Sequence, residues 1–306
     1  MATESIPGSI AEAPRQGFRL SAAEGYRGLL RFLAGPYIPI GVLLIVMVIP
    51  AIFAPVLAPY DPVEVNPVQR LQPPALFGGT WEHPLGTDTL GRDVLSRMMH
   101  GARVSFFVSL SALTIAMGIG ATTGLVAGYL GSWVDHVLMR LVDIKIALPD
   151  ILVALVIVAI FGPSVVIALI IVIFYTWSIF ARVTRAQVLV LRELDFIALA
   201  KVAGAGRFWT IRKHILPNVM NTLLVVASLT IGIVILLEAT LSFLGVGIPR
   251  PTPAWGVMVA DGRDYIARAW WLSTFPGLAI VLVVLAFNFL GDWLRDRLDP
   301  KRRSLL

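Results

Sequence analysis

The sequence contains no cysteine, and only 14% of its 306 residues are charged. The lack of cysteine excludes disulfide bonds and metal sites built on thiolates. Globular domains carry about 25% charged residues, so a soluble fold of this length would need far more polar surface than the chain offers. Because 57% of the residues are hydrophobic, we predict an all-α integral membrane protein.

The residue patterns of common enzymes and cofactor sites are also missing. The chain has no G-x4-G-K-[ST] phosphate loop, so it cannot hydrolyse ATP by that route. His83, Asp88 and Asp93 lack the spacing of a known metal site, and a turn with a helix cap at Thr87 or Asp88 is the favoured interpretation. We therefore expect no catalytic residue, metal or cofactor on this chain. The net charge of +6 is assigned to basic cytoplasmic loops rather than to nucleic-acid binding.

Long apolar runs make up much of the sequence. Six segments can cross about 30 Å of hydrocarbon, since a helix rises about 1.5 Å per residue. They are residues 36–58, 104–128, 137–160, 163–181, 219–244 and 272–294. Four prolines predict a kink or break near the ends of the first segment: Pro36, Pro39, Pro50 and Pro55.

The positions of lysine and arginine predict the orientation. With a cytoplasmic N-terminus, the inner segments hold most of the 25 basic residues, as the positive-inside rule requires. Both termini are then cytoplasmic. The chain divides into an N-terminal tail (1–35), a first membrane helix (36–58), an extracytoplasmic loop (59–103), a membrane core (104–294) with a cytoplasmic loop (182–217), and a C-terminal tail (295–306).

One polar stretch, Glu193–Asn218, interrupts two apolar runs on the cytoplasmic side. Helical spacing places Phe196, Leu199, Ala200 and Ala203 on one face, and the glycines at 204 and 206 permit a sharp turn. Pro217 suits the first turn of the next membrane helix. We predict a surface helix–turn–helix whose small apolar face is rimmed by basic residues. Such a surface suits either a protein partner or lipid headgroups, and both interpretations stay open at this point.

This stretch resembles the EAA loop of ABC-importer permeases, which has the signature EAA-x3-G-x9-I-x-LP. Ala198-Leu199-Ala200, Gly204 and Leu216-Pro217 are in register with it. Two positions depart from the signature, because Ala198 stands where glutamate is usual and His214 where isoleucine is usual. The resemblance implies a role in ATPase coupling for ten residues: Asp195, Phe196, Ala198, Leu199, Ala200, Lys201, Gly204, Ala205, Leu216 and Pro217.

Most of the chain is similar to the dipeptide/oligopeptide/nickel permease family, in its second-permease (C) type. The segments that carry the similarity include "HPLGTDTLGRDVLSRMMHGARVS", "LEATLSFLGVG", "TPAWGVMVADGRDYI" and "FNFLGDWLRDRLDP". The resemblance implies a type I permease fold in the inner membrane and a heterodimer with a second homologous permease. It also implies two cytoplasmic ATPases that carry ATP-Mg, an extracytoplasmic binding protein, and peptides or nickel complexes as substrates.

Two further features fall inside the membrane segments. Gly120, Gly124 and Gly128 recur every four residues and predict close packing against another helix, in this chain or in the partner permease. Glu238 either lines the translocation pathway or pairs with a polar group near the outer surface. A stand-alone secondary carrier or channel is the alternative function. It would need several charges inside the spans, and only Glu238 stands clearly within one.

Two groups near the membrane boundaries receive structural interpretations. Asp135, Arg140, Asp143 and Lys145 are predicted to form a solvated network on the inner side. Three tryptophans are predicted to anchor at the outer boundary as an aromatic belt: Trp255, Trp270 and Trp271.

Overall fold

The computed structural model describes residues 35–298. The predicted tails, 1–35 and 295–306, therefore lie largely outside the described residues. Within the described range the regular structure is helical, apart from a single bridge between Thr87 and Asp93. Five helices are long and apolar enough to span a membrane, and there are six if a bent pair counts as one span. The predicted all-α membrane architecture is confirmed.

The helices follow in chain order. The first span consists of α2 (Tyr37–Leu43), a π turn (Leu44–Val48) and α3 (Ile49–Leu57). The centre contains α4 (Val94–Leu130), α5 (Ser132–Ala147), α6 (Asp150–Phe161) and α7 (Val165–Leu191). The remaining elements are α8 (Asp195–Val202), α9 (Arg207–Thr210), a second π turn (Ile211–Ile215), α10 (Leu216–Phe243), α11 (Trp255–Gly262) and α12 (Trp271–Leu298).

The prediction of one continuous helix over residues 137–160 is wrong. The segment breaks between α5 and α6, which meet at an angle of 88°. Pro149 causes the break, because proline lacks an N–H and disfavours helical geometry in the residue before it. Leu148 accordingly takes an extended conformation, with φ −84° and ψ 132°.

Two membrane helices are longer than their apolar runs. Helix α4 begins at Val94 rather than residue 104, and α7 continues to Leu191 rather than 181. Hydropathy marks the part of a helix at hydrocarbon depth, whereas caps determine where the helix starts. The side chain of Asp93 caps α4 by accepting a hydrogen bond from the Ser96 N–H at 2.7 Å. The predicted cap at Thr87 or Asp88 is therefore wrong by several residues.

Both π turns stand directly before a proline. The N–H of Ile49 donates to Leu44 O just before Pro50, and the N–H of Leu216 donates to Ile211 O just before Pro217. A proline ring collides with the carbonyl four residues earlier, and a wider turn relieves that collision. Pro50 thus distorts the middle of the first span, not only its ends. Pro217 lies in the first turn of α10, as predicted, and α10 follows α9 and the second π turn without a break, so that Arg207–Phe243 forms one span.

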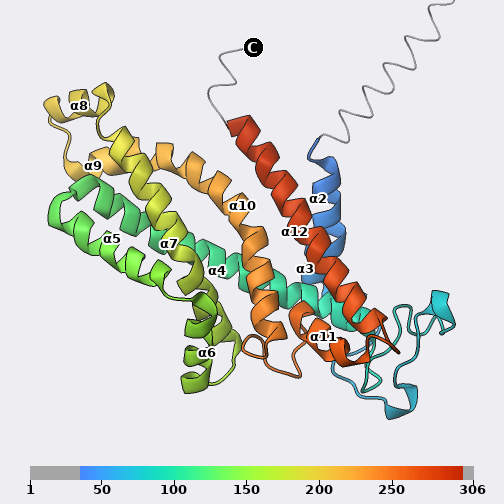
Figure 1. Cartoon of the computed structure of the whole chain (residues 1–306). Coiled ribbons are helices and arrows are strands. Elements are labelled where there is room, and N and C mark those ends of the chain that lie inside the picture. The colour runs from blue at the N-terminus through green and yellow to red at the C-terminus, as the bar shows by residue number, and fades with distance from the viewer. Residues whose placement is uncertain (1–34, 299–306) are drawn as a thin grey trace, which may run out of the picture.

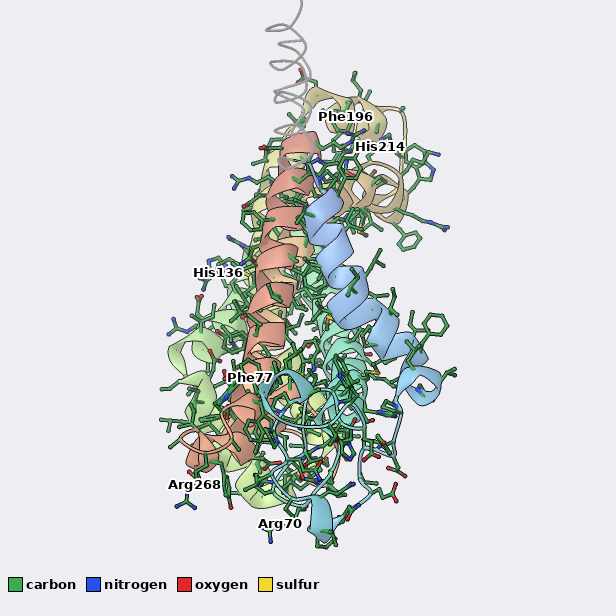
Figure 2. All side chains as sticks on the ribbon, turned by 90° about the vertical axis from the view of Figure 1, so that its right-hand side faces the viewer. Arg70, Phe77, His136, Phe196, His214 and Arg268 are labelled. Atoms are coloured by element: carbon green, nitrogen blue, oxygen red, sulfur yellow. The ribbon has the colours of Figure 1, made fainter. Side chains whose placement is uncertain are left out.

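The molecule has two distinct ends (Figure 1). Helix α8 lies at one end, together with the first residues of α2 and the last turn of α12. The loop before α4 and helix α11 lie at the opposite end. Figure 2 shows the same separation in side chains, with Phe196 and His214 at one end and Arg70 and Arg268 at the other.

Candidate functional site

A short helical hairpin at one end of the molecule, comprising α8, the turn at 203–206 and α9, contains most of the predicted coupling residues. Helix α8 is closed by a Schellman motif, in which the Ala205 N–H donates to Ala200 O and the Gly204 N–H donates to Lys201 O, both at 3.0 Å. Gly204 has φ +88°, a conformation that glycine adopts without steric cost. The predicted helix–turn–helix is therefore present, with its turn at the predicted glycine.

The hairpin presents large apolar side chains to its surroundings. Leu199, Val202 and Phe208 are 67%, 88% and 75% exposed, and Phe196 is also exposed. Only Ile197 of α8 is fully buried, so a single side chain anchors this helix to the rest of the chain. A contiguous group of exposed apolar side chains marks a surface that contacts either another protein or the membrane.

The predicted coupling residues divide into two groups in space. Asp195, Ala198, Leu199 and Lys201 are exposed along α8, while Ala200 and Ala205 are half-buried. A surface depression of about 420 Å³ lies beside the turn, and its lining includes Ala200, Gly204, Ala205 and Trp209. Leu216 and Pro217 lie further on, after the second π turn.

His214, which departs from the signature, has a clear packing role. Its ring centroid lies 5.0 Å from that of Trp209 and 5.9 Å from that of Phe196. The imidazole therefore fills the space between α8 and α9. Sequence reasoning found neither contact, because both depend on how the hairpin folds back on itself.

Arginine side chains tie helix α7 to the neighbouring helices α4 and α5. Arg192 donates from Nη1 to Gly128 O at 2.8 Å, which links the end of α7 to the end of α4. Arg185 forms a bidentate pair with Asp135 of α5, at 2.5 and 2.6 Å. Arg182 contacts Asp143 at 3.0 Å. The charged residues of α5 were predicted to form a solvated network with one another, and this is corrected, because Asp135 and Asp143 pair with arginines of α7.

The glycine stripe of α4 packs against α7 of the same chain. A Cβ atom added to Gly120 would lie 2.6 Å from the Cβ of Phe180, and one added to Gly124 would lie 2.6 Å from the Cβ of Thr184. At Gly128 the corresponding distance to the Val188 Cβ is 2.9 Å. These distances leave no room for any side chain. Of the two packing partners considered, the structure favours the one within the chain.

Glu238 is buried, with 1% of its surface exposed, between α4 and α10. Its carboxylate accepts hydrogen bonds from Ser105 of α4 at 2.8 Å and from Ser242 of its own helix at 2.9 Å. These two hydrogen bonds offset part of the free-energy cost of burying a carboxyl group. Glu238 thus joins two helices in this conformation.

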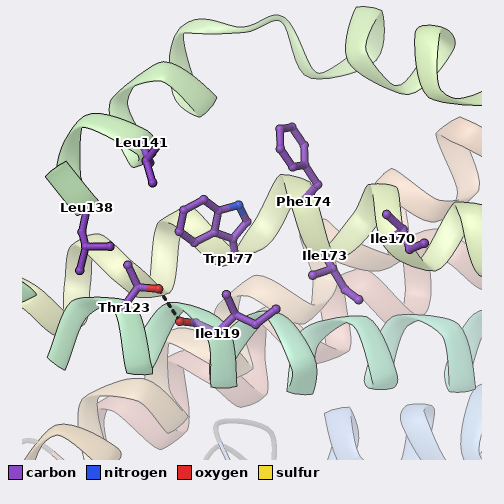
Figure 3. Close-up of a pocket in the computed structure, with 8 residues that line it drawn as sticks. All are labelled: Ile119, Thr123, Leu138, Leu141, Ile170, Ile173, Phe174 and Trp177. Carbon is purple, nitrogen blue, oxygen red and sulfur yellow. Dashed lines mark hydrogen bonds between the residues drawn. The ribbon is translucent and has the colours of Figure 1, made fainter. Parts of the chain in front are cut away.

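An apolar groove of about 410 Å³ lies between α4, α5 and α7 (Figure 3). Its walls are aliphatic and aromatic, with Phe174 and Trp177 on α7 and Leu138 and Leu141 on α5. Thr123 is the one lining residue with a hydroxyl group, and this hydroxyl already donates to Ile119 O at 2.8 Å. The groove suits hydrocarbon rather than a polar ligand.

The opposite end of the molecule is held by buried ion pairs. Asp88 pairs with Arg92 at 2.6 Å and also with Arg97, and Arg97 reaches Asp261 of α11 at 3.4 Å. His83 contacts Asp93 at 2.9 Å. Among residues 35–298, no group of three or more metal-binding side chains is placed to hold a metal ion.

Two of the predicted belt tryptophans are buried instead. The indole N–H of Trp255 donates to Met98 O at 3.0 Å, and that of Trp271 donates to Thr87 O at 3.2 Å. Trp255 thus fixes α11 to the start of α4, and Trp271 fixes the loop before α4 to the start of α12. The belt interpretation is therefore wrong for both, because tryptophan near a boundary can equally supply a buried hydrogen-bond donor.

Comparison with known proteins agrees with this arrangement. Residues 120–304 match the family of binding-protein-dependent transport system inner membrane components, and residues 40–74 match the N-terminal transmembrane domain of oligopeptide transport permease C. The chain is 44% identical over 262 residues to the di/tripeptide transport permease DppC of Pseudomonas aeruginosa, covering 85% of this chain and 86% of that protein. It is 48% identical over 264 residues to the dipeptide permease DppC of Escherichia coli, covering 86% and 88%.

A solved structure shares the fold. The permease of an inward-facing MetNI methionine ABC transporter superimposes with a TM-score of 0.55 at 16% identity, covering 66% of this chain and 96% of that one. These relatives set aside the alternative of a stand-alone secondary carrier or channel. The chain belongs to the binding-protein-dependent transport system inner membrane components, as a multi-pass ABC-importer permease of the C type and not an enzyme.

Proposed function

We propose that this permease imports di- or oligopeptides and forms their pathway as a heterodimer with a second, homologous permease. The relatives named above are permeases for di- and tripeptides, which favours peptides over nickel complexes. The proposal includes an extracytoplasmic binding protein that delivers the substrate. In this arrangement both termini and the hairpin are cytoplasmic. This agrees with Figure 1, in which the start of α2, the end of α12 and helix α8 lie at the same end of the molecule.

The observation that carries the proposal is the exposed apolar face of the hairpin. Leu199 and Val202 project from a helix that buries one residue, Ile197. We infer that each of two cytoplasmic ATPases docks on one such hairpin, here and in the partner permease. ATP-Mg is bound by those ATPases and not by this chain.

Coupling requires that ATPase movement reaches the membrane helices. The hairpin connects directly to α7, and Arg192 ties that junction to α4 through Gly128 O. A shift of the docked hairpin therefore moves α7 and α4 together. The two ATPase states can drive this movement only if they differ in contact free energy with the hairpin.

Co-purification tests the docking role. The permease is expressed with its neighbouring permease and ATPases, and the complex is captured through a tag on this chain. Gly204→Trp places a side chain at φ +88°, where any L residue is strained, so we expect loss of the ATPases and retention of the partner permease.

Gly206→Ala is the matched control. Gly206 also has open space around its Cβ position, but its φ of −67° suits any residue. This variant should retain the ATPases as the wild type does. Equal retention of the ATPases by Gly204→Trp would contradict the docking role, and capture of no ATPase by the wild type would contradict the assembly.

A further inference from the structure

A second feature of the hairpin is a pocket on its inner side, where it meets the ends of α4 and α7. The pocket has a volume of about 410 Å³. Tyr129 and Leu130 contribute its membrane side, and its remaining lining consists of Arg192, Lys201, Ala205 and Arg207. Three of these six residues carry a positive charge, and none of the described residues that line it is acidic.

The positive charge in the pocket is poorly balanced. Arg192 is fixed by Gly128 O at 2.8 Å and by Glu193 at 2.9 Å, so it forms an ordered wall. Lys201 and Arg207 have no ion-pair partner among residues 35–298. Cations gathered around one cavity repel one another, and a bound anion converts this repulsion into attraction.

The pocket borders the end of the apolar run in α4. That run ends near residue 128, and Tyr129 and Leu130 follow it directly, whereas the apolar run of α7 ends near residue 181, well before Arg192. Tyrosine is favoured at the membrane–water boundary, because its ring stays in apolar surroundings while the hydroxyl reaches water. We infer from Tyr129 that the pocket is within reach of lipid headgroup phosphates.

We propose that this pocket binds a phosphate-bearing anion between Arg192, Lys201 and Arg207. A guanidinium group presents paired N–H donors that match two phosphate oxygens, and the lysine adds a point charge. The phosphate comes either from the headgroup of an anionic lipid such as phosphatidylglycerol or from free phosphate in solution.

The most exposed apolar side chains of the hairpin, Leu199, Val202 and Phe208, do not line this pocket. Two of the predicted coupling residues, Lys201 and Ala205, do line it, so the pocket adjoins the surface proposed for the ATPase. An anion bridging Lys201 and Arg207 to Arg192 would hold the hairpin against the ends of α4 and α7. On the proposed transport function, it would thereby set how firmly ATPase movement reaches the membrane.

Lipid binding tests the proposal on the permease pair purified without ATPases, so the result does not depend on coupling. Native mass spectrometry measures retained phosphatidylglycerol against phosphatidylcholine after delipidation and controlled addition of each. We compare the wild type with K201Q/R207Q. Each basic residue near an anionic surface contributes about fivefold to affinity, so the double substitution should weaken phosphatidylglycerol binding by about thirtyfold.

The matched control is R212Q/K213Q, which removes two exposed basic residues of the same segment that do not line the pocket. It should bind phosphatidylglycerol like the wild type. A second arm measures the thermal shift that inorganic phosphate alone produces in lipid-free detergent. A shift that K201Q/R207Q loses, without selective lipid retention, identifies free phosphate as the source.

Two results would overturn the anion site. One is phosphatidylglycerol and phosphate binding by K201Q/R207Q equal to that of the wild type. The other is a wild type that neither retains phosphatidylglycerol over phosphatidylcholine nor shows a thermal shift with phosphate. Because Lys201 and Arg207 are exposed, gel filtration should show the double variant to be folded.

Discussion

The Nζ atom of Lys145 lies 3.0 Å from Oδ1 of Asp150, across the sharp break between α5 and α6. The carboxylate oxygen receives no aligned hydrogen bond, so the contact is Coulombic. The same ammonium group donates to Tyr175 O of α7 at 2.8 Å and lies 4.7 Å from the ring centre of Tyr175. One lysine thus joins both halves of the broken span to α7.

The first prediction concerns this lysine. Lys145→Met removes the partner of Asp150, whose side chain is 32% exposed, together with the hydrogen bond to Tyr175 O, and we expect a loss of about 2 kcal/mol in the free energy of unfolding. K145M/D150N should recover part of the loss, because it also removes the unpaired charge. Thermal unfolding in detergent measures both variants.

Its control is the exposed ion pair between Arg182 of α7 and Asp143 of α5. Their side chains are 56% and 59% exposed, so D143N should change stability by less than about 1 kcal/mol. A K145M protein as stable as the wild type would show that the pair does not hold the break in place.

The second prediction compares two glycines of α4. Gly124 faces α7, where an added Cβ would collide with Ala181 O and the Thr184 side chain, whereas Gly118 has nothing within 4 Å. Alanine favours helices over glycine by about 1 kcal/mol, so G118A should be neutral or stabilising. G124A should destabilise by about 1–3 kcal/mol through overpacking.

The two substitutions are chemically identical and differ only in what the methyl group meets. Unfolding of both variants in the same detergent isolates the packing effect. Equal shifts in the unfolding midpoint would mean that α4 and α7 are not in the close contact described here.

The hairpin illustrates what the sequence could predict. The turn at Gly204 and the exposed face with Phe196 and Leu199 depend on local spacing and on one glycine conformation. Local rules are sufficient for such features. The stripe through Gly124 was predicted for the same reason, although its partner helix was not.

Features that depend on distant residues could not be predicted. The bond from Ser105 to Glu238 spans 133 positions, and the pairing of Arg185 with Asp135 spans 50. Hydropathy merged α5 and α6 into one segment, because both halves are apolar and a single Pro149 decides the break. Pro149 is visible in the sequence, yet whether it bends the helix slightly or breaks it depends on what α6 packs against.

The third prediction separates two roles of Glu238. E238Q retains a carbonyl oxygen that can accept from one serine, and the hydroxyl of the other serine can rotate to accept from the amide. We expect E238Q to fold and to transport close to the wild-type rate. E238L leaves the buried Ser105 and Ser242 hydroxyl groups without this partner and should lose about 1–3 kcal/mol of stability.

Uptake of labelled peptide into vesicles, together with thermal unfolding, measures both properties. A folded E238Q protein with greatly reduced uptake would contradict the expectation. It would assign the negative charge of Glu238 to the translocation pathway itself.

The last prediction concerns two arginines that share Asp261 at the end of the molecule opposite the hairpin. Arg97 is 2% exposed and pairs with Asp88 as well as Asp261, whereas the side chain of Arg250 is 64% exposed and contacts Asp261 at 2.6 Å. Removing one member of a buried pair costs about 3–5 kcal/mol, because its partner is left charged and unpaired. An exposed pair contributes about 0–1 kcal/mol.

R97M should therefore lower the unfolding midpoint strongly and reduce hydrogen-exchange protection of residues 86–93, while R250A should do neither. Salt distinguishes the two further, since roughly 1 M salt screens exposed charges within about 3 Å and buried ones far less. The small effect of R250A should disappear at that concentration, and the large effect of R97M should remain. Similar small shifts for both variants would show that the loop before α4 is held by the Trp271–Thr87 hydrogen bond rather than by its ion pairs.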